Sequence, residues 1–259
     1  MKSRKNASPQ KNSGNIQLNR QKFAPRDGVS IQNLNVQKTD GPVLRYIPLG
    51  GLEEVGRNMS FFEYEDEIVI IDMGIQFPED ETPGVDFIIP NITYLEPKKQ
   101  NIKAVVLTHG HYDHIGAIPY LTQRLSSVTI YTTALTKAII EKRQAEFPNA
   151  PKLQIYLIKN GDRIRVGKHF ELEFFAVAHT IPDTVGVLLA TPAGNMVHFA
   201  DFRIDYDAEG NPLGLDEIER VGKQGIHCFL VDSTNASKPG RSVSEKMVIK
   251  NLEELFLKV

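Results

Sequence analysis

The sequence predicts an α/β fold in which two β-sheets are covered by helices on their outer sides. From Val43 onward, short apolar runs rich in β-branched and aromatic residues are separated by Gly, Pro and Asn, which is typical of strands and turns. Other segments carry apolar residues at helical spacing. Several strand-like runs end in Asp or His, as expected where strands deliver side chains to one edge of a sheet sandwich.

The expected elements follow one another along the chain after the first 42 residues. Glu65-Asp66 marks a turn between the opening strands, and Pro119 is tolerated in the first turn of a helix. The expected helices are residues 118–125 and 134–147. The expected strands lie within residues 43–51, 59–74, 102–108, 127–133, 153–158, 162–167, 170–180, 184–191 and 195–202, and one more ends at Asp232.

Length and composition limit the class of protein. With 259 residues, 41% of them apolar, the chain can form one large domain, or one domain and part of another. Its single cysteine, Cys228, excludes an internal disulfide framework. The sequence has neither a long apolar run nor an apolar N-terminal segment, which argues against a membrane span and a signal peptide. We therefore expect a cytoplasmic protein without membrane contact.

Residues 1–42 differ in composition from the rest of the chain. They carry eight Lys or Arg and two acids, a net charge of +6 in a chain whose net charge is −2. Because they are rich in Asn, Gln, Ser and Lys and poor in aliphatic residues, we expect them to form a disordered basic tail. Such a tail either contacts nucleic-acid phosphates or only improves solubility, and the sequence leaves both open.

The densest group of metal-binding residue types is His109-x-His111-x-Asp113-His114, directly after the expected strand 102–108. At a turn that follows a strand, neighbouring side chains can converge instead of alternating between faces. Imidazoles and a carboxylate at this density suggest two adjacent divalent ions, with zinc as the expected metal and manganese as the alternative. A His-rich exposed loop without metal is the competing interpretation.

Further polar residues close apolar strands elsewhere, namely Asp72, His179 and Asp201. A strand-terminal Asp by itself is more often a turn former or helix cap. Its recurrence beside the histidine motif favours delivery of all three side chains to the same sheet edge. Asp232 and Ser233 close another strand and are expected near this edge, although turn chemistry explains them equally well.

This arrangement resembles the metallo-β-lactamase superfamily, and within it the β-CASP nucleases of the bacterial ribonuclease J family. The resemblance runs from about Val43 to the end of the chain. Tyr112 departs from it, standing where an acidic residue is usual, as does Phe199-Ala200, which replaces Thr-Gly. The matching stretches are PLGGLEEVGRNMS, IDMGIQFPEDETPGVDFIIPNITYL, LTHGHYDHIGAIPYL, AHTIPDTVGVLLATPAGNMVHFADFRID and DSTNASKPGRSVSE.

The resemblance implies a role for each candidate residue. His109, His111 and His179 would hold the first ion, Asp113 and His114 the second, and Asp201 would bridge both. Asp72 would orient the cluster from behind, so that Asp72, Asp113 and Asp201 are the implied catalytic carboxylates, and Ser233 is a candidate substrate contact. The implied activity is hydrolysis of single-stranded RNA, as a 5′-to-3′ exonuclease with some endonuclease activity, in RNA maturation and decay.

Other functions share these ligands. Relatives in the superfamily cleave thioesters, lactones and lactams, so the metal motif alone does not define the substrate. A non-catalytic RNA-binding subunit is a further alternative, since the last metal-binding histidine of the family has no counterpart in this sequence. The remaining histidines, His169, His198 and His227, are interpreted as structural, with His169 exposed in a turn.

The C-terminal segment SVSEKMVIKNLEELFLKV predicts an amphipathic helix with Ser242-x-x-Glu245 as its capping box. The helix has no closing Gly or Pro, so we expect its apolar residues to lack the partner against which they would pack. The resemblance implies an incomplete αββα sandwich over residues 43–235 and the beginning of a β-CASP insert over residues 236–259. We therefore expect the chain to be an N-terminal portion of a longer protein and, without the last metal-binding histidine, to be weakly active or inactive by itself. Its oligomeric state stays open.

Overall fold

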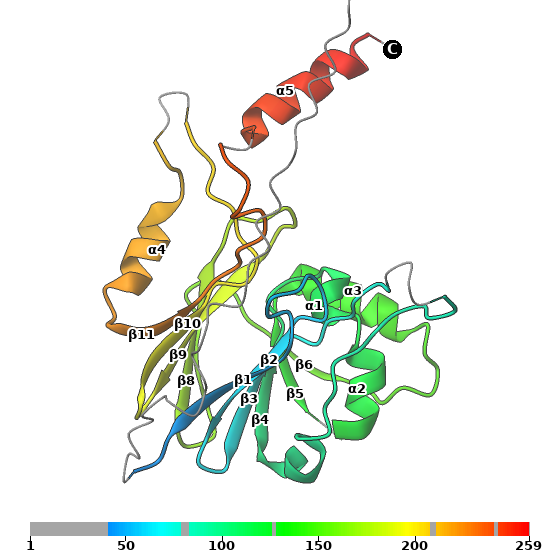
Figure 1. Cartoon of the computed structure of the whole chain (residues 1–259), viewed down its shortest axis with the longest axis vertical. Coiled ribbons are helices and arrows are strands. Elements are labelled where there is room, and N and C mark those ends of the chain that lie inside the picture. The colour runs from blue at the N-terminus through cyan, green and yellow to red at the C-terminus, as the bar shows by residue number, and fades with distance from the viewer. Residues whose placement is uncertain (1–40, 79–82, 126–127, 208–210, 241–242, 259) are drawn as a thin grey trace, which may run out of the picture. The chain divides into compact units, whose positions relative to one another are not determined.

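Two β-sheets face each other and carry helices on their outer sides (Figure 1). The computed structural model describes residues 41–78, 83–125, 128–207, 211–240 and 243–258. Residues 1–40 of the expected basic tail lie outside the described part of the chain. None of the described helices is long and apolar enough to cross a lipid bilayer.

The first sheet contains six strands in sequential order, β1 to β6. Strands β1 to β3 form antiparallel hairpins, and β3 to β6 run parallel to one another. Its strands are β1 (Leu44–Gly50), β2 (Met59–Tyr64), β3 (Glu67–Ile71), β4 (Ile102–Val106), β5 (Thr129–Thr132) and β6 (Gln154–Leu157). The parallel crossovers carry the 3-10 helix η2 (Glu96–Asn101) and the helices α1 (Tyr112–Ile115), α2 (Ile118–Leu125) and α3 (Ala134–Gln144).

The second sheet has the order β11-β10-β9-β8-β7. Its pairs are antiparallel except β10 and β11, which run parallel. The strands are β7 (Arg163–Val166), β8 (Phe170–Ala176), β9 (Val185–Thr191), β10 (Gly194–His198) and β11 (Ile226–Leu230). The parallel crossover carries α4 (Leu215–Gly222), and α5 (Glu245–Phe256) follows β11.

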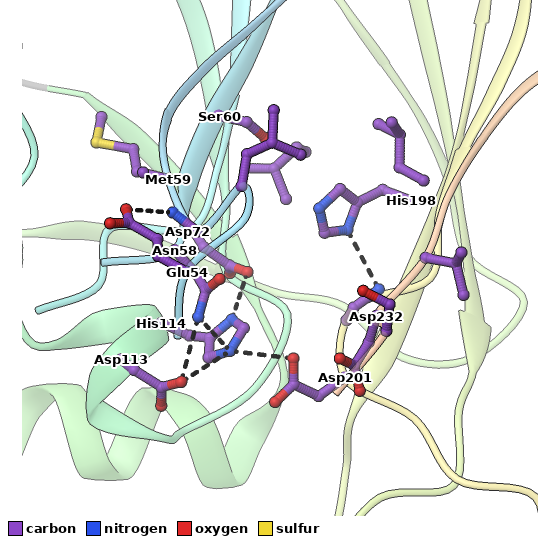
Figure 2. A pocket seen from close by; sticks show the side chains of 18 of the residues that line it. Glu54, Asn58, Met59, Ser60, Asp72, Asp113, His114, His198, Asp201 and Asp232 are labelled. Carbon is purple, nitrogen blue, oxygen red and sulfur yellow. Dashed lines mark hydrogen bonds and ion pairs between the residues drawn. The ribbon is translucent and has the colours of Figure 1, made fainter. Parts of the chain in front are cut away.

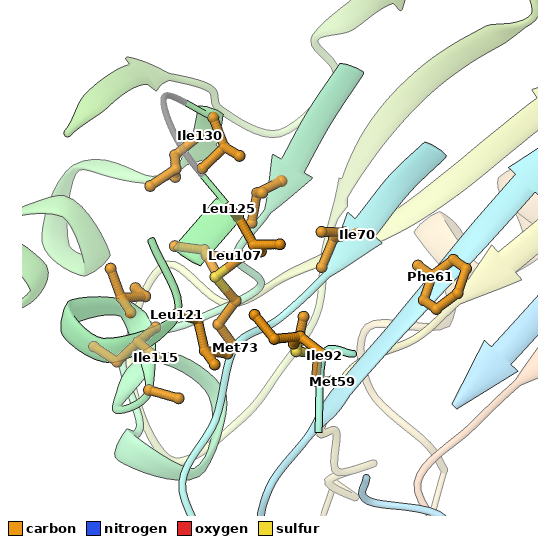
Figure 3. Packing of buried hydrophobic residues seen from close by; sticks show 14 of the residues in the cluster. Met59, Phe61, Ile70, Met73, Ile92, Leu107, Ile115, Leu121, Leu125 and Ile130 are labelled. Carbon is orange, nitrogen blue, oxygen red and sulfur yellow. The ribbon is translucent and has the colours of Figure 1, made fainter. Parts of the chain in front are cut away.

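The strands of the first sheet are apolar on both faces because both faces are covered. In β3, Ile68 and Ile70 belong to the core under the helices, whereas Val69 and Ile71 belong to the core between the sheets. Successive strand residues point to opposite faces, so a sheet buried on both sides reads as a continuous apolar run. Figure 3 shows the helix-side core, where residues of β3 and β4 pack against α1 and α2.

A third apolar cluster covers the outer face of the second sheet. Phe175, Leu188 and Val197 of the sheet pack with Val221 of α4, and Ile218 lies against the same cluster. Helix α4 was not predicted, although its sequence carries Leu215, Ile218 and Val221 at helical spacing. The two sheets with outer helices confirm the predicted α/β sandwich.

The structure corrects three details of the predicted elements. The ligand motif lies only partly in a turn, since His111 is the N-cap of the single helical turn α1. Helix α3 ends at Gln144 instead of residue 147. Helix α5 is capped by Ser244, whose side chain accepts a hydrogen bond from the Met247 amide, whereas the predicted cap, Ser242, lies outside the described residues.

Candidate metal centre

The predicted ligands meet where four strands end at one edge of the sandwich. Asp72 directly follows β3, the histidine motif follows β4, and His179 and Asp201 lie after β8 and β10. Asp72 has a left-handed backbone with φ 61°, a conformation that Asp adopts more readily than most residues. Gly74 allows α1, which carries Asp113, to approach, since a Cβ atom at Gly74 would lie 1.5 Å from the Asp113 carbonyl oxygen.

Three imidazoles and one carboxylate form a first group of converging ligand atoms. The Nδ1 atom of His111 lies 3.1 Å from His109 Nε2 and 3.2 Å from His179 Nε2. Asp201 completes the group, with its Oδ2 atom 3.6 Å from His179 Nε2.

A second group contains Asp113, His114 and the other oxygen of Asp201. The Nε2 atom of His114 lies 3.5 Å from Asp113 Oδ2 and 3.3 Å from Asp201 Oδ1. Asp201 therefore directs one carboxylate oxygen toward each group, which is the arrangement expected of a bridging ligand.

These donor sets fit divalent metal ions. Ligand atoms about 2.1 Å from a tetrahedral ion are separated from one another by about 3.4 Å. The spacings within the two groups, 3.1 to 3.6 Å, are close to that value. Imidazole nitrogens and carboxylate oxygens are also the ligands that zinc and related ions take in proteins.

Asp72 contacts His114 from behind and is connected to His109 through Thr108. Its Oδ2 atom lies 2.8 Å from His114 Nδ1, and both of its oxygens accept hydrogen bonds from the Thr108 hydroxyl. That hydroxyl lies 3.0 Å from His109 Nδ1. Asp72 thus orients His114 directly and His109 through Thr108, which leaves the Nε2 atom of each ring facing the ligand groups.

The pKa values of the two buried ligands His109 and His114 are shifted in opposite directions. Burial, reinforced by the neighbouring His114, lowers the pKa of His109 to about 3. Burial also disfavours the charged form of His114, but the carboxylates of Asp72, Asp113 and Asp201 raise its pKa well above the usual value. His109 is therefore neutral at pH 7, the form in which imidazole binds metal.

The two acids of the second group stay ionised. Burial would raise the pKa of Asp201, but hydrogen bonding to His114 and the charges of the surrounding histidines hold it at about 2. The same opposition, with His114 as the main favourable partner, lowers the pKa of Asp113. Both groups offer anionic oxygens at neutral pH.

A cavity of about 660 Å³ opens beside the second group. Figure 2 shows Asp72, Asp113, His114, His198 and Asp201 around it. Asp232, Ser233 and Thr234 also line the cavity, as expected for residues near this edge. The Thr234 amide donates to Asp232 Oδ1, so the expected turn chemistry is present at the same place.

The structure also places residues that the sequence did not single out. Thr108 connects Asp72 to His109, and Asn58 lies 3.2 Å from Asp113 Oδ2 although 55 residues separate them in the chain. No local signal identifies Asn58, because only the packing of the first hairpin against α1 brings it there.

The three histidines interpreted as structural have different surroundings. His198, which lines the cavity, accepts a hydrogen bond from the Ala200 amide, and burial lowers its pKa. His227 accepts one from the Asn195 amide. His169 was expected to be exposed, but it is half-buried, packs edge-on against Tyr64 and lies 3.1 Å from a Glu65 carboxylate oxygen.

The fold and the donor groups define a metal-binding protein of the αββα sandwich class. Residues 82–239 match the family model described as a beta-lactamase superfamily domain. The chain belongs to the beta-lactamase superfamily.

Proteins named ribonuclease J are similar to this chain. The chain is 40% identical over 216 residues to that of Thermus thermophilus, which covers 81% of this chain and 38% of the relative. It is 39% identical over 207 residues to that of Mycoplasma pneumoniae, which covers 80% of this chain and 36% of the relative. The predicted resemblance is confirmed, and the chain spans little more than a third of the length of these curated relatives.

A solved structure of a protein of unknown function from Enterococcus faecalis V583 has a similar fold. It superposes with a TM-score of 0.65 over 84% of this chain and 58% of that protein, at 19% identity. At this identity the likeness supports the fold alone.

Proposed function

We propose that this chain carries the metal centre of a ribonuclease that hydrolyses phosphodiester bonds in RNA. The observation that supports the proposal most strongly is the pair of ligand groups sharing Asp201, in a chain similar to ribonuclease J proteins. A phosphodiester is itself anionic, so its hydrolysis suits a site that concentrates positive charge between two metal positions.

We propose that the first group holds one divalent ion and the second group another. Zinc suits the three imidazoles of the first group, and manganese is the alternative. Bound there, the ions would acidify water and neutralise negative charge that develops on the phosphate. Asp201 would contact both ions, and Asp72 and Thr108 would keep the imidazoles oriented.

The cavity beside the second group is the proposed substrate site. Its volume of about 660 Å³ is within the range typical of small-molecule sites and suits a nucleotide unit of a single strand. Ser233 lies on its wall and is a proposed contact to the RNA backbone. We assign the chain the 5′-to-3′ exonuclease and endonuclease activities expected from the resemblance, acting in the cytoplasm.

We also propose the domain organisation expected from the resemblance. Residues 43–235 would form the metallo-β-lactamase domain, and residues 236–259 would begin a β-CASP domain. The exposed apolar side chains of α5, among them Leu252 and Phe256, are compatible with a helix that packs against further protein.

The test compares 5′-phosphorylated single-stranded RNA with a chromogenic thioester, using the metal-loaded chain. Asp201→Ala is expected to lower occupancy of both metal positions and to reduce RNA turnover by more than the roughly 10–100-fold typical of residues behind the ligands. Elemental analysis and product gels measure the two effects. Asp86→Ala, which changes an exposed loop carboxylate, is the matched control and is expected to behave like the unaltered chain.

Three results would contradict the proposal. Turnover of the thioester without turnover of RNA would favour hydrolysis of a thioester, lactone or lactam. Metal binding without any turnover would favour a non-catalytic RNA-binding role. Unchanged metal stoichiometry in Asp201→Ala would remove Asp201 from the bridge.

A further inference from the structure

Asn58 is held beside the second ligand group by its own backbone. Its amide donates to the Asp113 carbonyl oxygen at 2.9 Å, and its carbonyl oxygen accepts from the Gly74 amide at 2.9 Å. Asn58 directly precedes β2, whereas Asp113 lies in α1. These two hydrogen bonds join the three segments. The backbone therefore helps to position the Asn58 side chain.

The end of the Asn58 side chain points into the second group (Figure 2). Its Nδ2 atom lies 3.1 Å from His114 Nε2 and 3.2 Å from Asp113 Oδ2. The same His114 atom lies 3.5 Å from Asp113 Oδ2 and 3.3 Å from Asp201 Oδ1. All four spacings are close to the edge of about 3.4 Å expected for a tetrahedral shell with ligands at about 2.1 Å.

The chemistry of an amide lets one side chain serve the site with and without an ion. As drawn, the amide nitrogen donates to Asp113 Oδ2 and lies 3.1 Å from His114 Nε2. Rotation of the side-chain amide by about 180° exchanges nitrogen for oxygen at nearly the same place, since the two ends have almost the same shape. The oxygen is a ligand for a divalent cation.

We propose that the Asn58 side-chain oxygen is a fourth ligand of the second metal position, beside Asp113, His114 and Asp201. In the metal-free protein the Asn58 amide nitrogen donates to Asp113 and lies beside His114 at the spacing that the ion requires. This inference rests on the two-metal site proposed above.

The additional oxygen also distinguishes the two positions. The first group contains three imidazoles and one carboxylate, whereas the second contains one imidazole and three oxygen donors once Asn58 is included. Carboxylate and carbonyl oxygens favour harder ions such as manganese and magnesium, and imidazole favours zinc. Asn58 therefore shifts the second position toward the harder ions.

The test titrates the metal-free 259-residue chain with Mn²⁺ by calorimetry and then with Co²⁺, whose visible absorption reports its ligands. The unaltered chain is expected to bind two ions. In Asn58→Leu the first ion is expected to bind as before, the affinity for the second to fall at least about 10-fold, and the Co²⁺ band of the second ion to change. Asn149→Leu, at an exposed position, is the matched control and is expected to change neither quantity.

Two kinds of result would overturn the proposal. Equal affinity and an equal band in Asn58→Leu and the unaltered chain would exclude Asn58 as a ligand. A weaker second ion with an unaltered band would show that Asn58 only orients Asp113. Asn58→Ala, which adds no bulk, carries the same expectation if the leucine variant fails to fold by circular dichroism.

The experiment separates this inference from the proposed function. A chain that binds a single ion would contradict both the two-metal site and the Asn58 ligand. A chain that binds two ions with unchanged affinities in Asn58→Leu would contradict the Asn58 ligand alone. RNA turnover is not a readout here, so the ligand assignment is tested independently of activity.

Discussion

Asp72 shows how one buried carboxylate can organise a site it does not enter. It is 2% exposed and contacts Thr108 and His114 but lies behind the ligand atoms. Its left-handed backbone turns the chain sharply as β3 ends, and the Thr108 amide donates to its Oδ1 atom at 2.8 Å. The carboxylate therefore links the end of β3 to the end of β4 and positions one imidazole of each ligand group.

Asp72→Asn is expected to weaken binding of both ions by roughly 10–100-fold, as loss of a partner behind a metal ligand typically does. Asn also tolerates a left-handed backbone, so the fold is expected to persist. Thr108→Val removes the hydroxyl contact to His109 but keeps the direct Asp72–His114 contact, and is expected to weaken only the first ion. Calorimetry and thermal unfolding measure both variants. A collapse of thermal stability with normal metal affinity would make Asp72 a turn former.

Buried glutamates hold helices against the outer faces of both sheets. Glu63 of β2 accepts hydrogen bonds from Tyr94 and from Lys98 of η2. Glu173 of β8 pairs with Arg220 of α4 and with Arg163 of β7, the latter at 2.6 Å. Each carboxylate is buried, so each requires its cationic partners.

The Glu173 interaction predicts a pH-dependent contribution to stability. Burial would raise the pKa of Glu173, but the hydrogen bonds from Arg220 and Gln224 and the charges of Arg220 and Arg163 hold it below its usual value. A lowered folded-state pKa gives stability that is fully present above the unfolded-state pKa and is lost as the pH falls through the folded-state pKa. This contribution should therefore be complete at neutral pH and decline below about pH 4.5.

Glu173→Gln is expected to lower the free energy of unfolding by about 1–2 kcal/mol at neutral pH, because both arginines are partly exposed and screened by solvent. The difference from the unaltered chain should shrink in acid. Urea unfolding at several pH values measures it. Glu171→Gln, at an exposed position two residues earlier on the same face of β8, is the control. A pH-independent difference between Glu173→Gln and the unaltered chain would show that packing, not charge, holds α4.

At the scale of the whole molecule, residues 41–259 form a compact unit by themselves. The apolar clusters described in this unit begin at Leu44, and together they fill three layers, under the helices of the first sheet, between the sheets and under α4. Residues 1–40 lie outside the described part of the chain, and their basic composition is the property from which we predict a contribution to function.

Deletion of residues 1–40 is expected to leave the thermal unfolding temperature unchanged within about 2 °C, since the described core lies outside the deleted segment. If the segment contacts RNA, its loss should weaken RNA binding at low salt and reduce the dependence of affinity on salt concentration. Binding to a labelled single strand at several salt concentrations measures both quantities. Equal affinity of the two chains at low salt would leave the segment a solubilising role.

Sequence patterns predicted the elements whose signals are local. The strands of both sheets and helix α2 were predicted because each carries its own apolar period or boundary residues. Helix α4 was missed although Leu215, Ile218 and Val221 recur in it at helical spacing. The cap of α5 was missed because two serines near α5 could each serve as cap. The half-buried position of His169 depends on Tyr64 and Glu65, more than 100 residues away in the chain.

By itself, the sequence determined the two-sheet sandwich and the chemical type of the site, because apolar periodicity and the motif from His109 to His114 are contained within short segments. Only the tertiary structure decided how the site is built. It brought Asp72 behind both ligand groups, directed one oxygen of Asp201 toward each, and placed Asn58 at a fourth corner of the second group. These relations join residues 22 to 87 positions apart, and distances across such separations are set by how the sheets pack, which no local pattern encodes.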